Sequence, residues 1–381
     1  MIRRALLTLT SVAALMAAAT TLVQAEEYHS KAHTFETTQI ADGLEVPWSM
    51  AWLPNGDMLV TERPGRLRII RNGSLLAAPV EGVPAVHHQG QGGLFDVVPH
   101  PDFASNKLVY LSFAKPLGEG STTAVVRGTF ENDRLANVET IFEADTAGRD
   151  GHYGARIVFD GDGYLFISIG DRQASPSGDL AAHASQDLTN HNGTVVRLHD
   201  DGRVPSDNPF VGRRDALPEI YSFGHRNPQS LTLNPITGDL WAGEHGPQGG
   251  DELNIVNPGV NYGWPVVGYG VNYGPGRPIH ATQEQEGMEG PKHYWVPSIA
   301  TSGLMIYGGD LFPNWKGDAF VGGLRGQLLA RVDINDAGDM AISDESLMVG
   351  IGRVRDVREG PDGAIYVATE NRGILRLTPA D

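Results

Sequence analysis

Side chains that could carry out chemistry gather in a few glycine-rich segments of this 381-residue sequence. The segments supply imidazoles, guanidiniums and carboxylates, and they cover residues 87–93, 151–156, 170–172, 224–229, 243–252 and 352–356. Glycine lets the backbone approach a ligand closely, so these segments suit an enclosed site. They contain no serine nucleophile elbow, Walker loop or His-x-x-x-His pair, and the chain has no cysteine. Acid–base chemistry is therefore indicated, whereas a thiol nucleophile, a zinc knuckle and an iron–sulfur cluster are excluded.

The elements that must position these segments are short strands joined by tight turns. A pattern of apolar strand, Pro/Asn/Asp/Gly turn and apolar strand occurs around residues 54–57, 100–102, 161–163, 234–238, 313–314 and 361–363. Six copies about 61 residues apart are typical of a propeller whose blades bury their faces against each other. The sequence therefore predicts an all-β fold, a six-bladed β-propeller of four-stranded antiparallel blades. A two-sheet sandwich is the alternative, and the absence of sustained helical periodicity disfavours a helical solenoid.

The two ends of the mature chain are expected to meet. A strand near residues 35–40 precedes the first copy of the pattern, and residues 374–377 end the last one. If these strands pair, the ring closes without an open edge. Residues 26–381 would then form a single catalytic propeller domain, and its connecting loops would converge at one end of the central channel.

The first 25 residues resemble an export signal. Arg3 and Arg4 precede an apolar run over residues 5–19, and Ala25 ends a stretch of small residues before two glutamates. We expect a cleaved secretory signal peptide over residues 1–25 and a periplasmic or secreted protein, with an uncleaved membrane anchor as the alternative. No later stretch is apolar enough to insert in a membrane, and the net charge of −17 disfavours nucleic acid as a partner.

Several motifs, in the same order along nearly the whole mature chain, resemble the glucose/sorbosone dehydrogenase family of soluble quinoproteins, especially its bacterial aldose sugar dehydrogenase branch. They are QGGL (91–94), HPDF (100–103), GHRNPQ (224–229), NYGWP (261–265) and RVRD (353–356). The resemblance implies a six-bladed propeller, which agrees with the repeat count. It also implies pyrroloquinoline quinone (PQQ) and calcium as cofactors.

The resemblance assigns catalytic roles to three residues. His152 matches the general base that takes the proton of the anomeric hydroxyl, and an imidazole suits this task near neutral pH. Asp171 matches the carboxylate that orients the base. Arg226 matches a cation at the quinone oxygens, where it can stabilise developing charge. The alternative for His152 is a loop or core histidine without chemistry.

Further cofactor contacts follow from the same resemblance. Asn227 matches a second contact to the quinone oxygens, and Gln91 a nearby amide. Arg353 and Arg355 can face one side of an extended strand and match the pair that holds cofactor carboxylates. An exposed strand face is the alternative for this pair. Arg325 aligns with a position that is lysine in the glucose-oxidising relatives.

Metal ligands are also implied. Gly246 and Pro247 match backbone carbonyls that hold the calcium ion beside the cofactor. Glu252 and Tyr262, with Asp251, match a second, structural calcium site. For the two acidic residues the alternative is solvated surface charge. Trp264 and Trp295 are expected in the pocket wall or in the blade cores.

The predicted function is PQQ- and calcium-dependent oxidation of aldose sugars to lactones. Because no Cys-x-x-Cys-His haem motif is present, electrons must pass to an external acceptor. Gly151 stands where glucose-specific relatives have an acidic residue, and the insertions around the pocket are short, which predicts broad aldose specificity and favours a monomer over a dimer. The alternatives are a calcium-dependent lactonase-type propeller hydrolase and a non-catalytic binding propeller.

Overall fold

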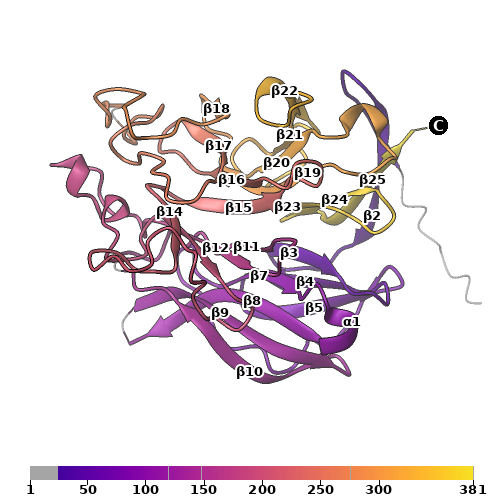
Figure 1. The fold of residues 1–381 in the computed structure, drawn as a ribbon. Helices are drawn as coiled ribbons and strands as arrows, with labels where there is room; N and C mark the ends of the chain where they lie inside the picture. Colours follow the sequence, from indigo (N-terminus) through magenta and orange to yellow (C-terminus); the bar gives the residue numbers. More distant parts are fainter. Residues whose placement is uncertain (1–24, 119, 147, 275, 381) are drawn as a thin grey trace, which may run out of the picture.

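The computed structural model describes residues 25–118, 120–146, 148–274 and 276–380. Apart from Ala25, the predicted signal peptide lies outside the described residues. Within them, the strands form six antiparallel sheets arranged as the blades of a propeller (Figure 1). The predicted six-bladed, all-β fold is confirmed.

The first three blades use consecutive strands. Blade 1 contains β3 (Pro47–Trp52), β4 (Met58–Glu62), β5 (Arg66–Arg71) and β6 (Ser74–Leu75). Blade 2 contains β7 (Leu94–Pro99), β8 (Leu108–Leu117), β9 (Gly120–Glu131) and β10 (Arg134–Glu143). Blade 3 contains β11 (Ile157–Phe159), β12 (Leu165–Ile169), β13 (Thr194–Leu198) and β14 (Ile220–Phe223).

The next two blades repeat the order, and the sixth combines both chain ends. Blade 4 contains β15 (Pro228–Leu233), β16 (Leu240–Glu244), β17 (Asp251–Ile255) and β18 (His293–Trp295). Blade 5 contains β19 (Thr301–Ile306), β20 (Ala319–Gly323), β21 (Leu328–Ile334) and β22 (Ala341–Leu347). Blade 6 contains β23 (Val354–Glu359), β24 (Ile365–Thr369), β25 (Gly373–Pro379), β2 (Thr34–Ala41) and β1 (Glu26–His29).

In the described part of the chain, helical structure is limited to short connections. They are α1 (Phe103–Asn106) and the 3-10 turns η1 (Leu180–Ala182), η2 (Ala184–Gln186) and η3 (Pro313–Trp315). Nowhere in the described ranges does a helix have the length and apolar character needed to cross a bilayer.

The hydrophobic core lies between the blades. The second strand of five blades is five residues long and buried at every position, as in β12 and β24. Such strands are covered on both faces, which explains their nearly continuous apolar sequences. Accordingly, six core clusters of described residues each join two neighbouring blades, for example Leu59 of blade 1 with Leu111 of blade 2.

The predicted ring closure is confirmed. β2 pairs antiparallel with β25, from Phe35 opposite Pro379 to Ala41 opposite Ile374, and the two strands lie side by side in Figure 1. Phe35 is fully buried and contacts Trp315 of the neighbouring blade edge to face, with ring centroids 5.5 Å apart. The N-terminal strand is thus held by backbone pairing and by an aromatic contact across the blade boundary.

Because Phe35 anchors this closure, Phe35→Ala should destabilise the fold by about 3–5 kcal/mol, the usual cost of emptying a buried aromatic site. Urea unfolding followed by tryptophan fluorescence measures the change. Glu36→Ala, one residue along the same strand and only partly buried, is the matched control. Equal stability of the Phe35 variant and the control would contradict the anchoring role.

The six repeated turns all join the first and second strands of a blade. Gly56 and Gly163 in two of them have φ of +87° and +84°, which favours glycine. In an antiparallel sheet, successive connections alternate between the two ends. The connections from second to third strand, and from one blade to the next, therefore lie at the end opposite to these turns.

Candidate functional site

Most predicted site residues come from loops at this opposite end or from the start of a strand that begins there, whereas Tyr262 lies in the long loop between β17 and β18. Gln91 lies on a link between blades, as do His152, Arg226 and Arg353, whereas Asp171 follows the second strand of blade 3. Loops far apart in the sequence are thus brought together by ring closure.

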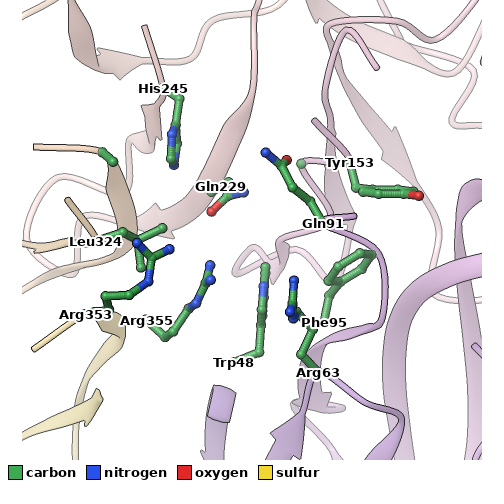
Figure 2. A pocket seen from close by; sticks show the side chains of 12 residues that line it. Trp48, Arg63, Gln91, Phe95, Tyr153, Gln229, His245, Leu324, Arg353 and Arg355 are labelled. Atoms are coloured by element: carbon green, nitrogen blue, oxygen red, sulfur yellow. The ribbon is translucent and has the colours of Figure 1, made fainter. Parts of the chain in front are cut away.

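Three cavities lie among these loops. The inner cavity, about 120 Å³, is lined by Trp48, Arg63, Gln91, Phe95, Tyr153, Gly154, Gln229, His245, Ala300, Leu324, Arg353 and Arg355 (Figure 2). The outer cavity, about 470 Å³, includes Gln91, His152, Asp171, Arg226, Pro247 and Trp264 in its wall. The loop cavity, about 20 Å³, includes Arg226, His245, Glu252, Tyr262 and Trp264. Gln91 and Arg226 each line two of them, so the cavities share walls.

His152 and Asp171 form a buried hydrogen-bonded pair. The distance from His152 Nδ1 to Asp171 Oδ1 is 2.6 Å, and the His152 backbone N–H donates to Gln91 Oε1 at 2.8 Å. His152 has φ of +47°, a left-handed conformation that a non-glycine residue adopts at a cost and that is frequent at functional sites. Since Asp171 can only accept, Nδ1 carries the hydrogen, and Nε2 is the nitrogen free to take a proton.

The surroundings keep this histidine neutral. Burial lowers the pKa of His152 below its ordinary 6.5, and the cations Arg226 and Arg172 act in the same direction, while Asp171 opposes them. Burial by itself would raise the pKa of Asp171, but bonds from His152 and Trp264 and the nearby Arg226 hold it below its ordinary value. The pair is therefore a neutral imidazole on an ionised carboxylate, as a general base requires.

The space beside the base is shaped by Gln173. A Cβ atom at Gly151 would lie 2.4 Å from the Gln173 side chain, which also lines the outer cavity. An acidic residue, which glucose-specific relatives have at the position of Gly151, would not fit here, because the amide of Gln173 occupies the volume that its side chain would need.

Arg226 lies at the junction of the outer and loop cavities. Its Nη1 donates to the carbonyls of His245 at 3.1 Å and Gly246 at 2.6 Å, and its backbone N–H donates to Glu244. Its buried Nε has no hydrogen-bond partner among the described residues. A guanidinium with an unused buried donor fits an acceptor of a ligand bound beside it.

His245, which the sequence analysis left without a role, lies between the inner and loop cavities. Burial, reinforced by Arg226, lowers the pKa of His245 to about 3, so the ring is neutral. Its Nε2 lacks a hydrogen-bond partner within the described part of the chain. The sequence did place His245 in one of the glycine-rich segments, residues 243–252. Burial, which the sequence does not show, is what distinguishes it from a surface histidine.

A cluster of guanidiniums lines the inner cavity. Arg353 and Arg355 both form ion pairs with Glu370. Arg355 Nε donates a hydrogen bond to one carboxylate oxygen at 2.8 Å, and Arg353 Nε lies 3.1 Å from the other. Arg355 is the more buried, and burial lowers its pKa to about 10, which still leaves it charged at neutral pH. Figure 2 shows both side chains pointing toward the cavity centre. The exposed-face interpretation of this pair therefore fails for Arg355.

Arg63 is a third guanidinium of this cavity and was missed in the sequence. It lies between β4 and β5, beside a Pro-Gly turn, and its Nη1 donates to the Gly90 carbonyl at 3.0 Å. Its buried Nε has no partner among the described residues. Within the described ranges, Glu370 pairs with both Arg353 and Arg355, and Arg63 has no ion pair. The cavity therefore has an excess of positive charge that suits an anionic ligand.

The remaining predicted cofactor residues differ in how close they lie to the cavities. Asn227 is buried, and its Oδ1 accepts from the Gly154 backbone N–H at 3.2 Å, beside the inner cavity. Gln91 lines both the inner and the outer cavity. Arg325 is exposed and borders none of the three cavities, whereas the preceding Leu324 lines the inner one. The assignment of Arg325 stays a prediction.

The predicted calcium ligands lie around the loop cavity. Gly246 and Pro247 line it, and the Gly246 carbonyl accepts from Arg226. Asp251 is fully buried, so it is not solvated surface charge. Its oxygens accept from the Gly246 and Ala300 backbone N–H groups and from Ser298, which ties down the loop between β16 and β17.

Glu252 is the acidic residue of the loop cavity with the fewest partners. The structure gives its side chain one hydrogen bond, from Asn254 Nδ2 at 3.3 Å. Burial and the neighbouring Glu244 raise the pKa of Glu252 well above its ordinary value. The Tyr262 hydroxyl donates to the Ile255 carbonyl at 2.5 Å and accepts from the Asn257 N–H, so the atom of Tyr262 left for a ligand is its carbonyl. No group of three or more His, Asp or Glu side chains poised for a metal occurs in the described ranges.

Trp264 and Trp295 lie in different surroundings. Trp264 lines the outer and loop cavities, and its indole N–H donates to Asp171 Oδ2 at 2.8 Å. Trp295 belongs to the core cluster between blades 4 and 5. The pocket-wall expectation thus holds for Trp264, and the blade-core expectation holds for Trp295.

Comparisons with known proteins agree on one family. The family model described as glucose/sorbosone dehydrogenase matches residues 44–376. The aldose sugar dehydrogenase YliI of Escherichia coli K12 is 41% identical over 355 residues, covering 91% of this chain and 93% of the relative. A solved glucose dehydrogenase structure is 44% identical with a TM-score of 0.84, covering 91% of this chain and 99% of that one. The PQQ-bound aldose sugar dehydrogenase of Streptomyces coelicolor is 28% identical with a TM-score of 0.73, covering 93% and 98%.

Proposed function

The chain belongs to the glucose/sorbosone dehydrogenase family, and from this premise we propose that it oxidises aldose sugars at the anomeric carbon, using bound PQQ and calcium and passing the electrons to an external acceptor. The observation that carries the proposal is the buried pair of a neutral His152 imidazole on the Asp171 carboxylate, beside a cavity with surplus guanidiniums. Relatives named as aldose sugar dehydrogenases, one of them PQQ-bound, support it.

The residues present fit PQQ, a flat molecule with three carboxylates and two adjacent quinone carbonyls. The three guanidiniums of the inner cavity can pair with carboxylates, and two of the site's arginines, Arg63 and Arg226, have an unpartnered buried Nε. Trp48 and Phe95 supply aromatic surface against which a planar ring can pack. When bound, PQQ would supply the two-electron oxidant for the sugar, with the external acceptor taking up the electrons.

The chain's own residues supply the rest of the reaction. His152 Nε2 takes the proton of the anomeric hydroxyl while the C1–H bond breaks, so the sugar loses one proton and one hydride and becomes the lactone. Asp171 fixes the ring and stabilises its cationic form. Arg226 would supply a cation that stabilises the negative charge developing during hydride transfer.

Glu252 would be a calcium ligand in the loop cavity. Its carboxyl group is buried beside Glu244, and no cation among the described residues pairs with it. The Tyr262 carbonyl is a second oxygen of the kind calcium prefers. At Gly246 the carbonyl already accepts from Arg226, so a cation there requires that guanidinium to turn toward the ligand. Asp251 contributes by holding the loop through its backbone bonds.

Calcium in 100-fold excess over its Kd should stabilise the cofactor-free protein by about 2.7 kcal/mol through mass action. Glu252→Gln should remove most of this effect, because the amide cannot offset the cation's charge. Thermal unfolding with calcium and with a chelator measures it, and Glu284→Gln, on an exposed loop, is the control. An equal calcium effect in both variants would show that Glu252 is not a ligand.

The guanidiniums also bear on the alternatives. A calcium-dependent lactonase would need acidic metal ligands in the channel, whereas the inner cavity is lined by Arg63, Arg353 and Arg355, whose charges would repel a metal bound there. We also propose that the protein is exported, that its signal peptide is cleaved after Ala25, and that the mature protein is a monomer.

Reconstitution tests the function directly. Purified apoprotein is incubated with PQQ and calcium, and reduction of an artificial electron acceptor is followed with several aldoses. We expect reduction that requires both PQQ and an aldose. A protein that binds PQQ and reduces the acceptor with none of the aldoses would be a binding propeller instead.

A further inference from the structure

We propose that Trp264 is a positioning residue for the proton transfer, because its indole N–H holds the oxygen of Asp171 that His152 does not use while its ring supports Arg226. The inference rests on the proposed function, since it gives that reaction's base a further partner. Trp264 Nε1 lies 2.8 Å from Asp171 Oδ2, and the Arg226 Cζ atom lies 5.2 Å from the indole ring. One side chain therefore contacts both the carboxylate behind the base and the Arg226 guanidinium.

Trp264 is itself firmly held. Its backbone N–H donates to the Gly224 carbonyl at 2.8 Å, and its own carbonyl accepts from Ser185 Oγ at 2.7 Å and Gln186 Nε2 at 2.8 Å. The side chain is nearly fully buried. The long loop between β17 and β18 thus reaches over blade 3 and delivers a fixed N–H donor to Asp171, 93 residues away in sequence.

The donor completes the environment of the carboxylate. Asp171 Oδ1 accepts from His152 and from the Gln173 backbone N–H at 2.9 Å, and Trp264 is the donor recorded for Oδ2. With donors on both oxygens, the carboxylate plane is fixed and the imidazole is aimed. The indole N–H also shares the negative charge of Asp171, which weakens the hold of Asp171 on a protonated His152.

Removing the indole N–H should therefore change the proton affinity of His152 as well as the orientation of its ring. Without the indole N–H, Asp171 attracts the imidazolium more strongly and His152 keeps its proton to a higher pH. The neutral His245 also interacts with His152, and Tyr273 lies in the same cavity wall. The cations that face His152 are Arg226 and Arg172, with Arg149 in the same wall. Their repulsion of the imidazolium remains in the variant, so the loss of the indole donor determines the direction of change.

The test uses Trp264→Phe and the matched control Trp295→Phe, a buried blade-core tryptophan. NMR titration of the His152 ring in the apoprotein should show a pKa raised by about one unit in Trp264→Phe, the size expected for one lost bond to a charged group. The control should leave it unchanged. In the reconstituted enzyme, kcat should fall about 10-fold or more, and the acidic limb of its pH profile should move upward by the same shift.

An unchanged His152 pKa in folded Trp264→Phe would overturn the proposal. If that variant does not fold, β-(3-benzothienyl)alanine at position 264 keeps the indole shape without the donor, and the same shift is expected. The His152 titration uses apoprotein and does not depend on sugar oxidation. A failure of sugar oxidation would therefore refute the proposed function without affecting the test of Trp264.

Discussion

His152→Ala should lower kcat of the PQQ-loaded enzyme by about 10²- to 10⁴-fold, the usual contribution of a positioned general base, while PQQ still binds. The imidazole is the group of the outer cavity whose free nitrogen can take the anomeric proton, and it lies outside the inner cavity that holds the guanidiniums. Stopped-flow reduction of an artificial acceptor, with PQQ binding measured by calorimetry, separates the two effects.

The control for this prediction is His29→Ala, an exposed histidine on β1. The pH profile gives a second readout. Burial lowers the pKa of His152 below 6.5, so wild-type kcat should stay constant from neutral pH downward and fall only below that lowered pKa. A His152→Ala enzyme with wild-type turnover would show that another group takes the proton.

Arg355→Met should weaken PQQ binding by about 10- to 100-fold, which corresponds to the loss of one or two charge-assisted hydrogen bonds. Arg355 is the most buried guanidinium of the pair on Glu370, and its removal leaves the carboxylate with Arg353 alone. Arg355→Lys should recover little of the affinity, because an ammonium cannot make the planar two-pronged contact.

Calorimetric titration of PQQ into the apoprotein measures this effect, with Arg203→Met as the control because that side chain is exposed and pairs locally with Asp201. Thermal unfolding of each variant checks that the fold is intact. Equal affinity of Arg355→Met and wild type would mean that the cofactor carboxylates are bound elsewhere.

The fold could be predicted because its signal is local and repeated. Each blade begins with a strand, a turn and a second strand close in sequence, and glycines such as Gly56 and Gly163 mark those turns. The copies around residues 100–102 and 313–314, which contain α1 and η3 in place of a tight turn, also join the first and second strands of their blades.

The site was harder to predict because it depends on contacts between distant loops. Arg63 follows a strand and precedes a Pro-Gly turn, so by sequence it reads as a turn residue, and only ring closure brings it to the cavity of Arg355. His245 and Glu370 gain their importance from burial and pairing. The bond from Trp264 to Asp171 spans two blades, and no local pattern encodes it.

The most direct test of sugar oxidation at this site is a single turnover without any acceptor. PQQ-loaded protein with calcium is mixed anaerobically with an excess of an aldose, and the lactone is quantified by mass spectrometry. We expect one lactone per loaded chain, and almost none from loaded His152→Ala in the same time. Bound PQQ with no lactone formed by the wild-type protein from any aldose tested would contradict it.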